Sequence, residues 1–346
     1  MGFFFSKKYK QKINKNDKLE KKNIKSVYVK IPAKLMISGE HSVVYNSKAV
    51  ICAINIFSKI EIKKISSHQI IIKDGKEKYK VDLQDFSIEH ENNDLILEII
   101  RRFFDTTKLP LCGIKIVIKN SIPIGCGLGS SSALVAGIVF GLNKMFGSEK
   151  KNANLLQIAT EIENIFHCKS SGADIQTIVK GGIVYFNDGK IKKIAHQIDE
   201  IYIINTGRPS FSTKNVVMNI YDRFTSSHDI WENIGNITKS ISEMMPSNKK
   251  ITKKIAENEI LLEKLGIVTP SVSDFIADLK ENKIYGKVCG AGTIAERENE
   301  GGSGIVGIFQ KLSKDQKKYL SALCRKNNFS LKKVYIYNAG ITIFSK

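Results

Sequence analysis

Residues 123–133 carry three glycines at alternate positions, Gly125, Gly127 and Gly129, followed directly by three serines. Glycine lets the backbone turn tightly and approach a ligand closely, because no Cβ stands in the way. The serines stand where a helix is expected to begin, so the unpaired amides of its first turn would point into the loop. These features predict a phosphate-binding loop, for a nucleotide.

Taken alone, this segment could also be an ordinary glycine-rich turn that caps a helix and binds no phosphate. It lacks the Gly-Lys-Ser/Thr ending of a P-loop, and its glycine spacing is not that of a dinucleotide-binding fingerprint. The interpretation therefore depends on what other chemistry-bearing residues the chain contains.

Two further segments contain ionisable groups at suggestive positions. Lys34 precedes a predicted strand, which is followed by the acid and imidazole of Glu40 and His41. Glu163 lies on a predicted helix, before a turn that ends in Asp174. A carboxylate paired with a lysine can accept an alcohol proton while the cation screens developing negative charge.

The elements that must position these groups mix strands and helices without a regular βαβ rhythm. Hydrophobic patterning predicts strands at 26–31, 35–37, 49–54, 58–63, 69–73, 79–82, 113–118 and 181–186, and helices at 93–104, 130–146 and 152–166. From residue 201 the pattern changes: a strand at 201–204 precedes a long helical tract over 212–283, strands at 286–289 and 304–309, a helix at 314–324 and two closing strands. We therefore expect an α+β fold with two domains, 26–198 and 199–346, after a flexible basic tail at 1–25.

Length and composition fit this picture. The 346 residues suffice for two domains with ample core. The longest apolar run, 133–142, is too short to span a bilayer, and no secretory signal precedes the fold. Six cysteines are scattered without a C-x-x-C pair, which predicts reduced thiols in a cytoplasmic protein.

The formal net charge of +20 comes almost entirely from lysine spread along the chain. No RNA- or DNA-binding motif accompanies it, so we expect no nucleic-acid partner, and any such binding should fall steeply with salt. The densest cluster, at 7–25, is interpreted as the flexible tail. Residues 1–6 fit a minimal myristoylation pattern, but a membrane contact through the tail is not expected. Anionic phosphorylated substrates are a further explanation of the charge.

Taken in order, these segments resemble the motifs of the GHMP kinase superfamily, and most closely those of its mevalonate kinases. The resemblance rests on Gly-Glu-His at 39–41, Gly-Leu-Gly-Ser-Ser at 127–131, the Ser-Gly-x-Asp turn at 171–174 and the glycine loop that follows a strand at 286–292. It covers nearly the whole chain after the tail. It implies a two-domain α+β fold with the active site in the cleft between the domains.

The resemblance also implies ATP and Mg²⁺ as cofactors and assigns roles to residues. The ATP phosphates would be wrapped by Gly125, Gly127, Leu128, Gly129, Ser130, Ser131 and Ser132. Ser131 and Glu163 would hold Mg²⁺, which prefers hard oxygen ligands. Asp174 would orient or deprotonate the substrate hydroxyl, and Lys34 would hold Asp174 and the transferred phosphoryl group.

At the acceptor end, the expected substrate contacts are Glu40, His41, Thr213, Gly290 and Ala291. Thr213 belongs to a Thr-Gly…Ser-Thr-Lys segment at 205–214 that resembles the second-domain segment of mevalonate-type kinases, with an ordinary capped helix as the alternative. Arg208 and Lys214 of this segment could instead hold a phosphate on the substrate, which keeps phosphomevalonate as an alternative acceptor.

The function that the resemblance implies is phosphorylation of the hydroxyl of mevalonate by ATP, giving 5-phosphomevalonate and ADP in isoprenoid precursor synthesis. The alternatives are a phosphomevalonate kinase, another small-molecule kinase of the superfamily, or a non-catalytic sensor. The joint presence of Lys34, Ser131, Glu163 and Asp174 argues against the sensor. The oligomeric state is left open, with a homodimer as one option.

Two departures from the superfamily pattern stand out. Ala33 replaces the glycine that usually precedes the motif lysine, which leaves the lysine in place. The second glycine loop, 290–304, contains a charged interruption where the family continues with glycines, and this predicts a mobile loop beside the substrate floor.

Overall fold

The computed structural model describes residues 24–45, 47–86, 94–147, 152–167, 170–224, 228–247, 249–295 and 302–346. The predicted tail lies outside this part of the chain apart from Ile24 and Lys25. Most of the charged interruption of the second glycine loop, 296–301, lies outside it as well.

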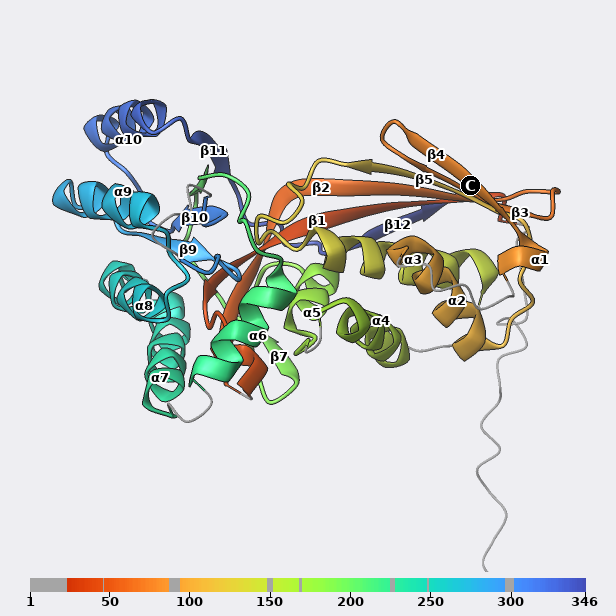
Figure 1. The fold of residues 1–346 in the computed structure, drawn as a ribbon, viewed down its shortest axis with the longest axis horizontal. Coiled ribbons are helices and arrows are strands. Elements are labelled where there is room, and N and C mark those ends of the chain that lie inside the picture. Colours follow the sequence, from red (N-terminus) through yellow and green to blue (C-terminus); the bar gives the residue numbers. More distant parts are fainter. Residues whose placement is uncertain are drawn as a thin grey trace, which may run out of the picture.

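An eight-stranded sheet organises the first half of the chain (Figure 1). Its path runs β12-β1-β2-β5-β3-β4, and β6 pairs with both β2 and β7. The strands are β1 (Ser26–Ser38), β2 (Ala49–Lys64), β3 (Gln69–Asp74), β4 (Glu77–Asp82), β5 (Ile114–Asn120), β6 (Ile183–Asn187), β7 (Lys190–Lys193) and β12 (Thr342–Ser345).

The two central strands are longer than the sequence pattern predicts. Residues 26–31 and 35–37 form one strand, β1, and residues 49–54 and 58–63 form another, β2. The pairing of β1 with β2 shifts register between Pro32 and Ala33 and again between Met36 and Ser38. Such bulges break the apolar alternation without ending the strand, so the pattern divides one element into two.

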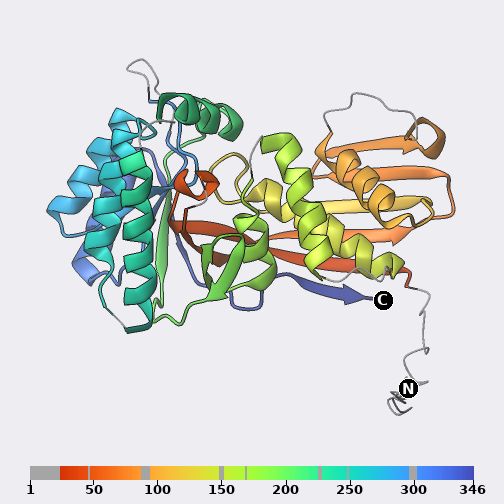
Figure 2. The same ribbon diagram turned by 90° about the horizontal axis from the view of Figure 1, so that it is seen from below.

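Helices cover one face of this sheet (Figures 1 and 2). They are α1 (Leu83–Phe86), α2 (Leu95–Thr107), α3 (Ser130–Phe146), α4 (Asn152–His167) and α5 (Ala173–Lys180). The central helix α3 packs closely on the sheet because Gly137 and Gly141 face it. A Cβ added at Gly137 would lie 2.7 Å from Cδ1 of Ile60, closer than real contacts allow.

A second, antiparallel sheet has the order β11-β8-β10-β9. Its strands are β8 (Ile201–Asn205), β9 (Gly286–Cys289), β10 (Ile305–Ile308) and β11 (Ser330–Val334). The helices of this half are α6 (Thr213–Phe224), α7 (His228–Met244), α8 (Thr252–Lys264), α9 (Pro270–Glu281) and α10 (Lys314–Lys326), with a short 3₁₀ turn η3 (Met245–Ser247). Another 3₁₀ turn, η2 (Ser42–Tyr45), lies between β1 and β2. Side chains of this sheet and these helices form a second hydrophobic core.

The end of the chain departs from the expected division at residues 198 and 199. After β11 the chain returns to the first sheet, where β12 pairs antiparallel with β1 from Val27 to Lys30. This pairing covers an edge of β1 that would otherwise expose unpaired backbone groups. Among the described helices, none combines the length and the apolar character needed to cross a membrane.

Candidate active site

The phosphate-loop glycines are placed where side chains would not fit. Gly129 is the N-cap of α3 with φ 73°, and no side chain caps the amides of the first turn. A Cβ at Gly129 would lie 2.6 Å from Cγ of Lys34, and one at Gly127 would lie 2.4 Å from the carbonyl oxygen of Cys289. The amide of Lys34 donates to the carbonyl of Leu128 at 3.0 Å. The loop is therefore fixed between β1 and the end of β9, with the first amides of α3 open to a ligand.

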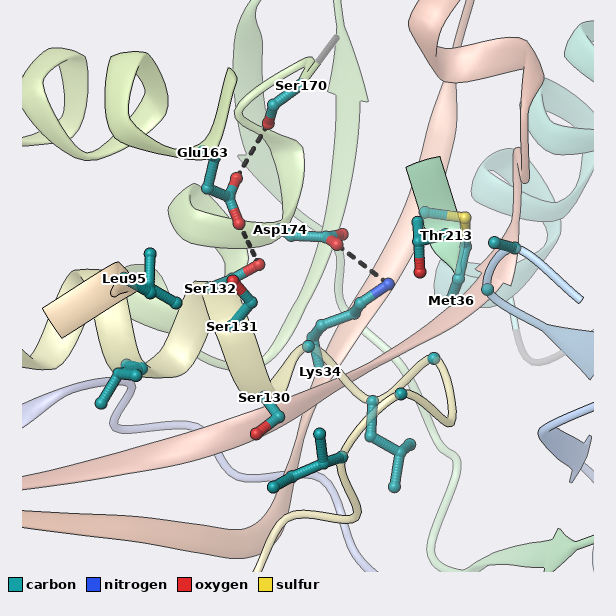
Figure 3. Close-up of a pocket in the computed structure, with 18 of the residues that line it drawn as sticks. Lys34, Met36, Leu95, Ser130, Ser131, Ser132, Glu163, Ser170, Asp174 and Thr213 are labelled. Atoms are coloured by element: carbon teal, nitrogen blue, oxygen red, sulfur yellow. Dashed lines mark hydrogen bonds and ion pairs between the residues drawn. The ribbon is translucent and has the colours of Figure 1, made fainter. Parts of the chain in front are cut away.

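This loop borders a cavity of about 420 Å³ (Figure 3). The site residues expected from the sequence that line it are Lys34, Gly125, Gly127, Leu128, Gly129, Ser130, Ser131, Ser132, Glu163, Asp174, Thr213, Gly290 and Ala291. Two expected substrate contacts, Glu40 and His41, are not among its lining residues.

Lys34 and Asp174 meet inside the cavity (Figure 3). Nζ of Lys34 lies 3.0 Å from Oδ2 of Asp174, and the lysine side chain is only 6% exposed, against 29% for the aspartate. Asp174 stands in the first turn of α5, whose N-cap Gly172 adopts φ 74°. Asp174 therefore lies beside two positive partners, the ammonium of Lys34 and the positive end of the α5 dipole.

Glu163 is a buried carboxylate beside this pair. It accepts hydrogen bonds from the hydroxyl of Ser132 and, at 2.8 Å, from that of Ser170. Burial, and after it the negative charge of Asp174, raise the pKa of Glu163 to about 7. Ser132 rather than Ser131 is thus the serine that holds this carboxylate, while Ser131 lines the same cavity (Figure 3).

Glu40 and His41 lie behind the cavity wall. The Glu40 carboxylate pairs with the ammonium of Lys287, and both side chains are fully buried. Nε2 of His41 lies 2.9 Å from the carbonyl oxygen of Ala291, to which it donates. Burial lowers the pKa of His41 to about 4, so the imidazole is neutral near pH 7. His41 thus contacts the second glycine loop, and Glu40 contacts the strand that leads into it.

Sequence reasoning did not single out Lys287. A signal was present, because a lysine stands beside Val288 and Cys289 in the strand predicted at 286–289, and the structure buries all four residues of that strand. A lysine is almost never fully buried unless it is paired, so its position in an apolar strand indicates a buried carboxylate partner.

The two basic residues offered as phosphate ligands are exposed. The Arg208 side chain lies beside the phosphate loop, where its Nε would be 3.3 Å from a Cβ added at Gly125. Lys214 is also exposed. Neither side chain lines the cavity.

Comparison with known proteins agrees with this geometry. Residues 94–182, which span the phosphate loop and Asp174, match the N-terminal domain of the GHMP kinases. The chain is similar to the GHMP kinases, and this similarity supports an enzyme that phosphorylates a small molecule. Within the superfamily it is most like the mevalonate kinases.

The mevalonate kinase of Archaeoglobus fulgidus is 27% identical over 282 residues, which cover 81% of this chain and 91% of the relative. The crystal structure of the Methanococcus jannaschii mevalonate kinase superposes with a TM-score of 0.75 at 24% identity, covering 90% of this chain and 98% of the other. A Streptococcus pneumoniae phosphomevalonate kinase, in complex with phosphomevalonate and AMPPNP, superposes with a TM-score of 0.72 at 19% identity, covering 90% and 99%. The predicted α+β fold and the predicted resemblance to the GHMP kinases are therefore confirmed.

Proposed function

We propose that this protein transfers the γ-phosphoryl group of ATP to the hydroxyl of mevalonate, giving 5-phosphomevalonate and ADP. The observation that carries the proposal is the Lys34–Asp174 pair, which faces the open N-terminus of α3 across one cavity. The similarity to archaeal mevalonate kinases over about four-fifths of the chain supports the choice of acceptor.

Phosphoryl transfer passes through a loose transition state, so catalysis is mainly alignment and charge neutralisation. The glycine loop and the first amides of α3 would hold the ATP phosphates. The loop cannot recede from them, because Gly127 and Gly129 are packed against Cys289 and Lys34. The phosphates are thereby held at a fixed distance from Asp174.

Asp174 would accept the proton of the acceptor hydroxyl on its carboxylate as the oxygen attacks the γ-phosphorus. Lys34 would then act on both partners. Its ammonium holds the carboxylate in place before transfer and neutralises the charge on the transferred phosphoryl oxygens during it. The burial of the lysine strengthens both effects, because little water screens the charge.

The residues present also fit a bound Mg²⁺. Glu163 and Asp174 are two neighbouring carboxylates, and the charge of Asp174 disfavours ionisation of Glu163, an arrangement that a cation relieves. Mg²⁺ in phosphoryl-transfer sites is usually held by one or two carboxylates together with phosphate oxygens and waters. Glu163 and Ser131 would hold the ion, and Ser132 would orient Glu163. When bound, Mg²⁺ supplies neutralisation of phosphate charge.

The cavity lining favours mevalonate over phosphomevalonate. Met36, Val43, Val44 and Val217 make part of the wall apolar, and Thr213 adds a hydroxyl. Lys34 is the only cationic side chain that lines it in the described part of the chain. A phosphorylated acceptor would bring a further phosphate that calls for additional cationic donors, whereas mevalonate brings methyl and methylene groups that suit an apolar wall.

The test is coupled ADP release from ATP and Mg²⁺ with mevalonate, phosphomevalonate, galactose and homoserine as acceptors. We expect turnover on mevalonate alone, and a loss of about 10²–10⁴-fold in Asp174→Asn. Asp105→Asn, an exposed aspartate on α2, is the matched control and should retain activity. Turnover on phosphomevalonate instead would contradict the choice of acceptor. Binding of ATP without turnover on any acceptor would favour the sensor.

A further inference from the structure

The fully buried Lys287–Glu40 pair lies outside the chemistry proposed above. Lys287 is on β9, the strand that leads into the second glycine loop, and its ammonium donates both to Glu40 and, at 2.7 Å, to the carbonyl oxygen of Val288. Glu40 directly follows Gly39, just after the end of β1. The pair therefore joins the end of the first sheet's central strand to a strand of the second sheet (Figure 1).

Two carboxyl groups lie near the ammonium of Lys287, and Glu40 is the one that forms an ion pair with it. Burial acts to lower the pKa of Lys287, but the Glu40 charge beside it contributes to a net rise, so the lysine is protonated near neutral pH. A second acid, Glu259 on α8, has a pKa raised to about 8 by burial, so it is largely neutral. Oε2 of Glu259 accepts from the amide of Val288 at 2.8 Å. Strand β9 is thus held by Glu40 and Glu259 together.

Two contacts connect the position of β9 with the wall of the cavity. The hydrogen bond from His41, the neighbour of Glu40, to the carbonyl of Ala291 fixes the loop directly after β9. Gly290 is pressed against the phosphate loop, since a Cβ there would lie 2.8 Å from Cα of Gly127. Gly290 and Ala291 themselves line the cavity. A shift of β9 would therefore move both a cavity wall and the support of the phosphate loop.

We propose that Lys287 and Glu40 are positioning residues, which hold the second glycine loop against the phosphate loop and do not contact the substrate. Stability alone is a weak reason for such a pair, because removing two charges from water costs about as much as their attraction returns. What the pair provides is one defined position for the loop. This role rests on the proposed kinase activity, but the placement of the loop can be measured without it.

The first measurement is hydrogen exchange of the amides in 286–295, followed by mass spectrometry in the absence of substrate. Lys287→Met and Glu40→Gln should each speed exchange in this segment, and the double variant should resemble the single variants. Lys332→Met, an exposed lysine on β11, is the control and should leave the segment unchanged. Unchanged exchange in Lys287→Met would overturn the proposal whatever the acceptor proves to be.

The second measurement is a double-mutant cycle on the acceptor KM, using whichever acceptor the panel above identifies. Each single variant should raise this KM by about tenfold or more with kcat changed much less, and the double variant should be no worse than the poorer single one. A merely destabilised enzyme would show a lower apparent kcat with its KM unchanged, against the proposal. If Glu40→Gln raises the acceptor KM by the same factor in the Lys287→Met background as in the wild type, Glu40 contacts the substrate itself and the proposal fails.

Discussion

The pKa of His41 tests whether the Gly-Glu-His segment at 39–41 faces the cavity or the interior of the protein. Burial lowers the pKa of this imidazole from 6.5 to about 4, and the hydrogen bond to Ala291 offsets only part of the effect. The unfolded chain therefore binds this proton more readily than the folded protein. The stability that neutral His41 contributes is complete above about pH 6.5 and is lost progressively as the pH falls toward about 4. Between pH 7.5 and pH 5, the expected loss in the free energy of unfolding is about 2 kcal/mol.

The assay is urea unfolding of the wild type and His41→Gln at both pH values. Trp231 is the single tryptophan of the chain, is buried, and stacks on Tyr45 with ring centroids 4.4 Å apart, so its fluorescence reports on this region. Glutamine keeps an amide donor for Ala291 but does not titrate, and the titration of all other groups cancels in the difference between the two proteins. The stability difference should shift by about 2 kcal/mol in favour of the variant at pH 5. A difference that is the same at both pH values would mean that His41 titrates normally, which would refute its burial behind the cavity.

Three further predictions concern the cavity and the tail. Glu163→Gln should raise the Mg²⁺ concentration needed for half-maximal turnover by about tenfold or more, as a Mg²⁺ titration would show, and an unchanged requirement would remove Glu163 from the proposed ligands. Gly129→Ala should abolish turnover and lower the melting temperature more than Gly147→Ala does, because both have positive φ but only the former would collide with Lys34. Deleting residues 1–23 should leave kcat and KM unchanged, since the cut precedes the first described backbone pairing, from Lys25 to the C-terminal residue; a large loss of activity with the fold intact would contradict this.

Elements with strong local signals were predictable from the sequence. The glycines and serines that open α3 and the apolar run that follows fix its bounds, and the helix spans 130–146 as expected. The merging of short predicted strands into β1 and β2 was not predictable, because a bulge such as that at Pro32 and Ala33 resembles a strand end in a single sequence. The return of β12 to β1 depends on long-range pairing, which leaves no local pattern.

The same distinction applies to the cavity. Lys34, Glu163 and Asp174 were selected through their place in ordered motifs, and the fold brings them to one cavity. The choice between Ser131 and Ser132 as the partner of Glu163 depends on how α3 is rotated against α4, and adjacent serines in a sequence do not reveal that rotation. The pairing of Glu40 with Lys287, 247 positions apart, could not be inferred from either residue alone.

The Lys34–Asp174 pair and the Lys287–Glu40 pair differ in a way that separates their proposed roles. Asp174 is 29% exposed in the cavity, so an acceptor can reach its free oxygen and deliver a proton there. Glu40 and Lys287 are fully buried, so no acceptor can reach either without displacing the backbone around them. A proton-transferring carboxylate needs a route to its substrate, and a pair that fixes a strand is most effective where water cannot compete. Accessibility rather than residue type is therefore the basis on which we propose a chemical role for Lys34 and Asp174 and a positioning role for Glu40 and Lys287.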